Sequence, residues 1–177
     1  VRGLRVTYGR QGWFSRSVDH VAVDGVDLRI ARGETLALVG ESGCGKSTMA
    51  RAITQLVRPD AGEVILRGGG PAVDLCRLRG GALRIQRQRV QMVFQDPYAS
   101  LDPRLTAAAI VAEPLRCFGR GRREADARAR HLLDEVGLGP ESGDRYPHQF
   151  SGGQRQRIGL ARALALEPAL LILDAPV

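Results

Sequence analysis

The stretch GESGCGKST, residues 40–48, constrains this chain more than any other part of its sequence. It follows the apolar run TLALVG at 35–40, which predicts a strand buried on both faces, and it opens a segment with helical apolar spacing. Glycines between a strand and a helix let backbone amides curve around a phosphate, and the helix N-terminus adds partial positive charge. A Gly-rich turn without a ligand is the simpler alternative. In this context, however, the pattern G-x-x-x-x-G-K-[ST] predicts nucleotide binding.

The use of lysine in this chain supports that prediction. The sequence has 26 Lys and Arg residues, and Lys46 is the only lysine among them. An ammonium is a compact point charge, whereas a guanidinium is a planar fork. Chance could explain one lysine, but its position in the Gly-rich loop indicates a contact with terminal phosphates. The neighbouring Ser47 hydroxyl is placed to ligate Mg²⁺.

Composition excludes several classes of protein. At 177 residues, with 44% hydrophobic and 25% charged residues, the chain is typical of a soluble globular domain. It contains no apolar run of about 18 residues and no signal-peptide core. Three scattered cysteines, Cys44, Cys76 and Cys117, indicate free thiols in a reducing compartment. The net charge of +7 fits nucleic acid, an anionic membrane or phosphate substrates, and does not choose among them.

Alternating strand and helix patterns predict an α/β fold. Period-2 alternation at 4–8 and 21–30 indicates an N-terminal antiparallel β region. Further strands are expected at 35–40, 58–66, 90–94 and 169–174, and helices at 46–57, 105–115, 123–138 and 151–168, with a loop and short helix at 67–89. We therefore expect a nucleotide-binding core over 1–95, a helical subdomain over 96–150, and a return to the core over 151–177.

Two more motifs carry chemistry. LLILD ends in Asp174, and an apolar strand ending in Asp is the usual partner of a phosphate loop in holding Mg²⁺. A core strand that ends in Asp by chance is the alternative. SGGQ at 151–154 has the pattern of a capping box, which is sufficient for a helix start. Its two glycines also leave the positive end of the helix open to a phosphate.

Taken together, GESGCGKST, VFQDPYASLDP, RYPHQFSGGQRQRIGLARALALEP and LLILD resemble the ATPase subunit of an ABC transporter. Within that superfamily the chain is most similar to the ATPases of bacterial oligopeptide, dipeptide and nickel importers. The resemblance implies a P-loop NTPase core with an inserted helical subdomain, and ATP and Mg²⁺ as cofactors.

The resemblance also implies roles for individual residues. Gln95 would be the Q-loop residue that contacts Mg²⁺ and the attacking water, and Asp174 the Walker B aspartate; these two are the expected catalytic residues. Metal contacts are expected from Ser47, Gln95 and Asp174. Tyr8, chosen over Trp13 and Phe14, would stack on adenine. The remaining nucleotide contacts implied by the family are Gly40, Ser42, Gly43, Cys44, Gly45, Lys46, Ser47 and Thr48 on one ATP, and Ser151, Gly152, Gly153 and Gln154 on the ATP of the opposite subunit.

The sequence departs from the family pattern near its end. Ala175 stands where the family has the glutamate that polarises the attacking water, and no D-loop or switch histidine follows it. His20, His131 and His148 lie upstream and are expected to be surface or structural residues. The fold is therefore expected to be C-terminally incomplete, the isolated chain marginally stable, and its ATP hydrolysis nearly absent.

The expected partners follow from the resemblance. They are membrane-spanning permease subunits, a second ATPase subunit in a head-to-tail dimer and, indirectly, an extracytoplasmic solute-binding protein, with the chain peripheral at the cytoplasmic face of the bacterial inner membrane. A soluble ABC ATPase acting on nucleic acid or the ribosome is the alternative function, and a hydrolysis-deficient ATP-binding fragment is another. The acids interleaved in RGRREADARARH and the few aromatic residues disfavour nucleic acid as a partner.

Overall fold

The computed structural model describes residues 1–9, 20–68, 70–96 and 100–174. Trp13, Phe14 and Ala175 lie outside the described residues. The chain divides into two units, residues 1–86 and 87–177, and each is considered by itself.

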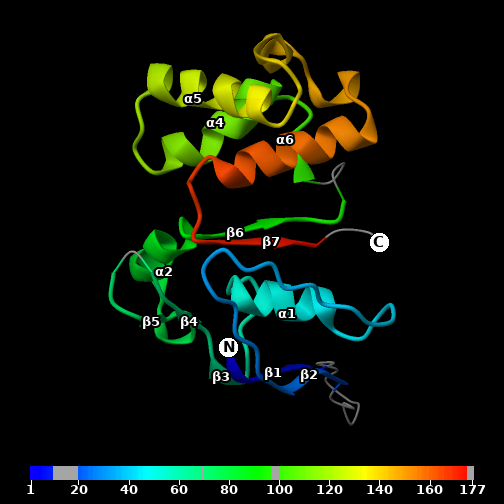
Figure 1. Cartoon of the computed structure of the whole chain (residues 1–177), viewed down its shortest axis with the longest axis vertical. Coiled ribbons are helices and arrows are strands. Elements are labelled where there is room, and N and C mark those ends of the chain that lie inside the picture. The colour runs from blue at the N-terminus through cyan, green and yellow to red at the C-terminus, as the bar shows by residue number, and fades with distance from the viewer. Residues whose placement is uncertain (10–19, 69, 97–99, 175–177) are drawn as a thin grey trace. The chain divides into compact units, whose positions relative to one another are not determined.

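The first unit contains a three-stranded antiparallel sheet in the order β2-β1-β3 (Figure 1). Its strands are β1 (Arg2–Tyr8), β2 (His20–Val26) and β3 (Ala61–Glu63). Leu4 and Val6 of β1 are almost fully buried, at 0% and 1% exposure, while Arg5 between them is exposed. The same alternation of apolar and polar residues in the sequence predicted strands here. The predicted N-terminal antiparallel β region is confirmed, since β1 pairs with β2 antiparallel.

Residues 35–40 differ from the prediction. No strand forms over this run, although its apolar composition predicted one, and Leu38 and Val39 are 46% and 95% exposed. A strand needs a hydrogen-bonded neighbour, and the described part of the first unit provides none for this run. The helix predicted after the loop does form, as α1 (Lys46–Ile53), and it buries Met49, Ala52 and Ile53.

The remainder of the first unit is a small β hairpin followed by short helices. Strands β4 (Ile65–Leu66) and β5 (Val73–Asp74) pair antiparallel. A 3-10 turn, η1 (Leu75–Arg77), leads to α2 (Gly80–Arg87), a helix with no fully buried residue. The sequence predicted the short helix but did not predict β5.

The second unit begins with two parallel strands. β6 (Val90–Val93) and β7 (Leu170–Leu173) pair in register, from Val90 opposite Leu170 to Val93 opposite Leu173. Both had been predicted from short apolar runs. They are far apart in sequence because the helical segment lies between them, as in a parallel crossover.

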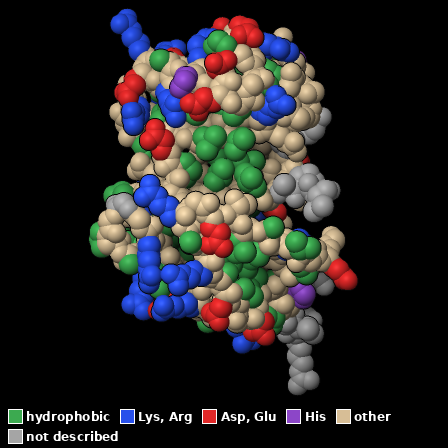
Figure 2. All heavy atoms as spheres, viewed as in Figure 1, with side chains coloured by type: hydrophobic (Ala, Val, Ile, Leu, Met, Phe, Trp, Pro, Cys, Tyr) green, Lys and Arg blue, Asp and Glu red, His purple; other side chains and the backbone are tan. Residues whose placement is uncertain are grey.

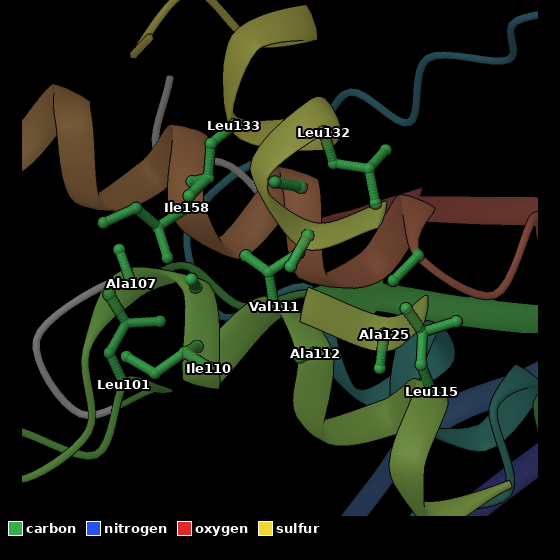
Figure 3. Packing of buried hydrophobic residues seen from close by; sticks show 14 of the residues in the cluster. Leu101, Ala107, Ile110, Val111, Ala112, Leu115, Ala125, Leu132, Leu133 and Ile158 are labelled. Carbon is green, nitrogen blue, oxygen red and sulfur yellow. The ribbon is translucent and has the colours of Figure 1, made fainter. Parts of the chain in front are cut away.

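Three helices pack around one core in the second unit (Figure 3). They are α4 (Ala107–Cys117), α5 (Arg122–Glu135) and α6 (Gly152–Leu164), and the short turns η2 (Pro140–Asp144) and η3 (Pro147–Gln149) lead from α5 to α6. The fully buried side chains include Ile110 and Val111 from α4, Leu132 and Leu133 from α5, and Ile158 from α6. Ala125 and Ala129 are also fully buried, so small side chains let α5 approach its neighbours closely.

The ends of these helices follow capping rules. The Thr106 hydroxyl accepts a hydrogen bond from the Ala109 amide (3.4 Å) at the start of α4. After α5, Gly137 has φ of 74°, the left-handed conformation that ends many helices. Across the described residues, no helix is both long and apolar enough to span a membrane.

Candidate nucleotide-binding site

The phosphate loop is closed by glycines in conformations that other residues rarely adopt. Gly43 and Gly45 have φ of 84° and 98°. Gly45 also approaches β2 so closely that a Cβ atom there would lie 2.1 Å from the carbonyl oxygen of Ala22. No other residue fits at this position without moving the backbone. Gly45 is the N-cap of α1 and places no side chain over the helix N-terminus, where the helix dipole favours an anion.

The side chain of Lys46 folds over this loop. Its ammonium donates hydrogen bonds to the carbonyl oxygens of Gly40 (2.6 Å) and Glu41 (2.7 Å). The Cys44 sulfur lies 3.5 Å from the same nitrogen. The ammonium is therefore held against the backbone of the loop. The two residues whose carbonyls hold it, Gly40 and Glu41, are exposed to solvent. A phosphate oxygen placed there could take over the hydrogen bonds that these carbonyls now accept.

Tyr8 lies next to the same loop. Its hydroxyl donates to the Thr48 hydroxyl at 3.5 Å, and its side chain is 42% exposed at the end of β1. The pairing of β1 with β2 sets this position, with Tyr8 opposite His20. An exposed aromatic ring beside the phosphate loop is suited to stacking on a base. The competing candidates, Trp13 and Phe14, are outside the described residues.

Gln95 and Asp174 follow the carboxyl ends of β6 and β7. The Asp174 amide donates to the Val93 carbonyl oxygen (2.9 Å), which continues the ladder by one step beyond β7. Because the two strands are parallel and in register, both residues emerge at the same edge of the pair. Ligands of open α/β sheets bind outside this edge. Gln95 is exposed and Asp174 is half-buried.

The capping box predicted at 151–154 is present. The Ser151 hydroxyl accepts from the Gln154 amide (3.3 Å), and the Gln154 side-chain oxygen accepts from the Ser151 amide (3.0 Å). Both glycines of the motif belong to the first turn of α6. There is no acidic residue in that turn to repel an anion.

The residues before the motif hold it in place. Phe150 is buried at 4% exposure, and the Arg145 guanidinium lies over its ring, 4.5 Å from the centroid. Arg155 Nε donates to the Pro147 carbonyl oxygen (2.8 Å), tying α6 back to η3. These supporting contacts were not predicted from the sequence, although the RYPHQF segment was part of the family resemblance.

Gly153 has no evident role in the packing of this chain. A Cβ atom there would meet nothing within 4 Å, and its φ is outside the left-handed range. The residue is also exposed. Glycine destabilises a helix by roughly 0.5–1 kcal/mol relative to alanine. Gly153 lowers helix stability and leaves open space at the surface. Such a position would let another molecule approach the helix backbone closely.

The three histidines lie as expected, on surfaces. His131 pairs with Glu135 one turn away (2.9 Å), and His148 stacks on Tyr146 with ring centroids 5.9 Å apart. Among the described residues, no cluster of three or more His, Cys, Asp or Glu side chains forms a metal-binding group. The predicted metal contacts would therefore depend on Ser47, Gln95 and Asp174 together with a nucleotide, and that set remains a prediction.

The fold and the loop geometry are those of a P-loop nucleotide-binding domain. Residues 23–177 match the family described as ABC transporter, and the chain belongs to that family. Among solved structures it is similar to the ATP-binding cassette MJ0796, in a dimeric post-hydrolysis state bound to ADP and Pi. The TM-score is 0.82 at 33% identity, over 97% of this chain and 71% of that one.

Curated relatives are named as ATP-binding proteins for the transport of peptides, oligopeptides or glutathione. The chain is 51% identical to the probable peptide ABC transporter ATP-binding protein y4tS of Sinorhizobium fredii, over 94% of this chain and 46% of that protein. It is 50% identical to the oligopeptide transport ATP-binding protein OppF of Salmonella typhimurium, over 96% of this chain and 50% of OppF. It is also 50% identical to the glutathione import ATP-binding protein GsiA of Salmonella choleraesuis, covering 28% of GsiA. The chain thus spans half or less of the length of these relatives.

The three thiols should differ in reactivity. Burial and the nearby Asp74 carboxylate raise the pKa of Cys76, whereas Cys44 and Cys117 are exposed. A raised pKa leaves less thiolate at a given pH, so iodoacetamide should modify Cys76 at least severalfold more slowly than the other two at pH 7.5. Its rate should keep rising as the pH passes the usual thiol range. Peptide mass spectrometry measures the rates, which should converge in urea; equal rates in the native chain would contradict the assignment.

Proposed function

We propose that this chain is the ATP-binding part of an importer subunit that couples ATP binding to uptake of peptides or a related solute. The phosphate loop carries the proposal: Gly45 fits β2 closely, and Lys46 is already held within the loop by two carbonyls. The relatives named for peptide, oligopeptide and glutathione transport give the solute class. The chain would act peripherally at the cytoplasmic face of the inner membrane, on permease subunits that it contacts directly.

In this proposal, the chain's residues bind and orient the nucleotide. Backbone amides of the loop would surround the β- and γ-phosphates, Lys46 would neutralise their charge, and Tyr8 would stack on the adenine. Mg²⁺, when bound with ATP, would supply positive charge that offsets the charge of the phosphates. Ser47 and Asp174 would hold it, and Gln95 would orient the water that attacks the γ-phosphate.

The second half of the site would come from another ATPase subunit. Ser151, Gly153 and Gln154 would approach the γ-phosphate of an ATP bound to the opposite subunit, where the positive end of α6 and the bare surface at Gly153 fit an anion. The similarity to a dimeric cassette bound to ADP and Pi supports this arrangement. The partner could be a second copy of this chain or a related ATPase.

Replacing Lys46 tests the nucleotide site directly. We expect Lys46→Ala to weaken MgATP binding roughly 10- to 100-fold, because a hydrogen bond to a charged group contributes roughly 1.5–3 kcal/mol. Displacement of a fluorescent ATP analogue measures the affinity. Arg51→Ala is the matched control, since Arg51 is an exposed cation on the last turn of the same helix and should leave affinity unchanged. Equal affinity in the wild type and the Lys46 variant would rule out this loop as the ATP site.

Replacing Gly153 should affect the stability of the chain and its dimerisation in opposite directions. Gly153→Ala should raise the free energy of unfolding by about 0.4–1 kcal/mol, because alanine restricts the unfolded chain and meets no clash. It should nevertheless reduce ATP-dependent dimerisation, measured by sedimentation velocity. Gly159→Ala in the same helix is the control, since its Cβ would make an ordinary 3.8 Å contact with Val93. Unimpaired dimerisation of the Gly153 variant would argue against the signature role.

Ala175 bears on hydrolysis. An absent general base typically costs about 10²- to 10⁴-fold in rate, so the chain should bind ATP and release phosphate very slowly. Ala175→Glu should raise phosphate release about 10²-fold, the low end of that range, without tightening ATP binding. Ala175→Gln, which has nearly the same size but cannot accept a proton, is the control. Rapid phosphate release by the unmodified chain, lost on Lys46→Ala, would show that Ala175 is no defect.

A further inference from the structure

Two arginines of the first unit converge on one carbonyl oxygen outside the phosphate loop. Arg58 Nη2 and Arg79 Nη1 donate to the Cys76 carbonyl oxygen at 3.1 and 2.8 Å. Arg79 Nη1 also donates to the Leu78 carbonyl oxygen at 2.6 Å. Both residues are exposed. Two guanidinium groups at the surface thus share one carbonyl oxygen as acceptor.

Two carboxylates at this turn are engaged by a third arginine. Asp74 pairs with Arg77 (3.1 Å), and Glu63 pairs with the same guanidinium (3.4 Å). Across the described ranges, neither Arg58 nor Arg79 forms an ion pair with a carboxylate. Like charges repel, and one carbonyl oxygen offsets only part of that repulsion. An added oxyanion would offset the remainder.

The fold fixes the carbonyl on which the arginines meet. Asp74 Oδ1 accepts from the amides of Cys76 (3.0 Å) and Val64 (3.2 Å), and so caps η1 and ties it to the neighbouring strands. The adjacent Leu75 is buried at 2% exposure, and its amide donates to the Val64 carbonyl oxygen (2.9 Å). The meeting point of the two guanidinium groups therefore belongs to a structured turn.

The surroundings are strongly basic. Residues 67–89 contain six arginines, and Asp74 is the only acid among them. Figure 2 shows Lys and Arg side chains gathered over the region that Figure 1 labels α2, β4 and β5. A basic patch concentrates anions near its surface, which favours binding at any site formed within it.

We propose that Arg58 and Arg79 form a second anion site, distinct from the ATP loop, which binds a phosphate group. Guanidinium forks match phosphate oxygens through paired hydrogen bonds, and two adjacent forks suit a tetrahedral oxyanion better than a single carboxylate. The phosphate could be carried by an anionic lipid headgroup or by a small soluble phosphate. The inference does not depend on the importer assignment.

A vesicle flotation assay tests the lipid source. Vesicles of phosphatidylcholine with phosphatidylglycerol should retain the wild-type chain, and the double variant Arg58→Gln, Arg79→Gln should bind at least about tenfold more weakly, since each arginine near an anionic surface contributes on the order of a fivefold gain. The matched control is Arg29→Gln, Arg32→Gln, which removes the same charge from exposed positions outside this site. It should lose less than about threefold.

Titration calorimetry with pyrophosphate tests the soluble source. It is done in a Lys46→Ala background, so that the ATP loop contributes little. Binding that depends on Arg58 and Arg79, without binding to vesicles, supports the site with a soluble ligand. Circular dichroism melts of all variants check that each one folds; Arg58→Lys with Arg79→Lys, which keeps the charge, is used if the glutamine variant does not.

Three results would overturn the proposal. The first is an equal loss of vesicle binding in the two double variants, which would indicate general charge attraction. The second is the absence of both vesicle and pyrophosphate binding in the wild type. The third is retention of duplex DNA that depends on these arginines while neither phosphate probe binds, which would indicate a nucleic-acid surface.

Discussion

The close approach of Gly45 to β2 is the constraint on which the nucleotide site depends. The Ala22 carbonyl oxygen occupies the space where a side chain would stand, so the loop can curve only if that position is glycine. The curve places Lys46 within reach of the loop carbonyls and starts α1 without a side-chain cap. A lysine held by carbonyls and the positive end of a helix would both favour the same anion. One backbone contact therefore sets both halves of the phosphate site.

In the second unit, a pair of parallel strands determines where two polar side chains lie. Its parallel strand pair brings Gln95 and Asp174 to one edge, although nearly eighty residues separate them, because the register from Val90 to Val93 fixes where each strand ends. The intervening helices pack on their own core, and α6 returns the chain to β7 after presenting the capped Ser151. The helical segment thus supplies a capped helix start whose first turn carries no acidic residue.

Local chemistry made much of this predictable from sequence. Capping at Ser151, the helix stop at Gly137 and the alternation in β1 are set by neighbouring residues, and each is confirmed. The strand predicted at residues 35–40 is wrong because a strand forms only when a neighbouring strand hydrogen-bonds to it. Apolar composition indicates that a segment can be buried, but it does not show whether such a neighbouring strand is present. The support of Phe150 by Arg145 was missed for the same reason, since a cation over a ring depends on how the chain turns between them.

The two anion sites proposed for the first unit differ in how the fold offsets positive charge. At the phosphate loop, Lys46 is a single ammonium that donates to two carbonyl oxygens, and the turn of the loop depends on glycine backbone. At Cys76, two guanidinium groups share one carbonyl, and their geometry comes from long side chains anchored to a capped turn. A nucleotide bound at the loop could meet backbone amides as well as the Lys46 ammonium, because glycine backbone can curve around a phosphate. Arg58 and Arg79 are exposed, so a phosphate bound there would be held at the surface by side chains alone. The loop is therefore better suited than the arginine pair to orienting a nucleotide.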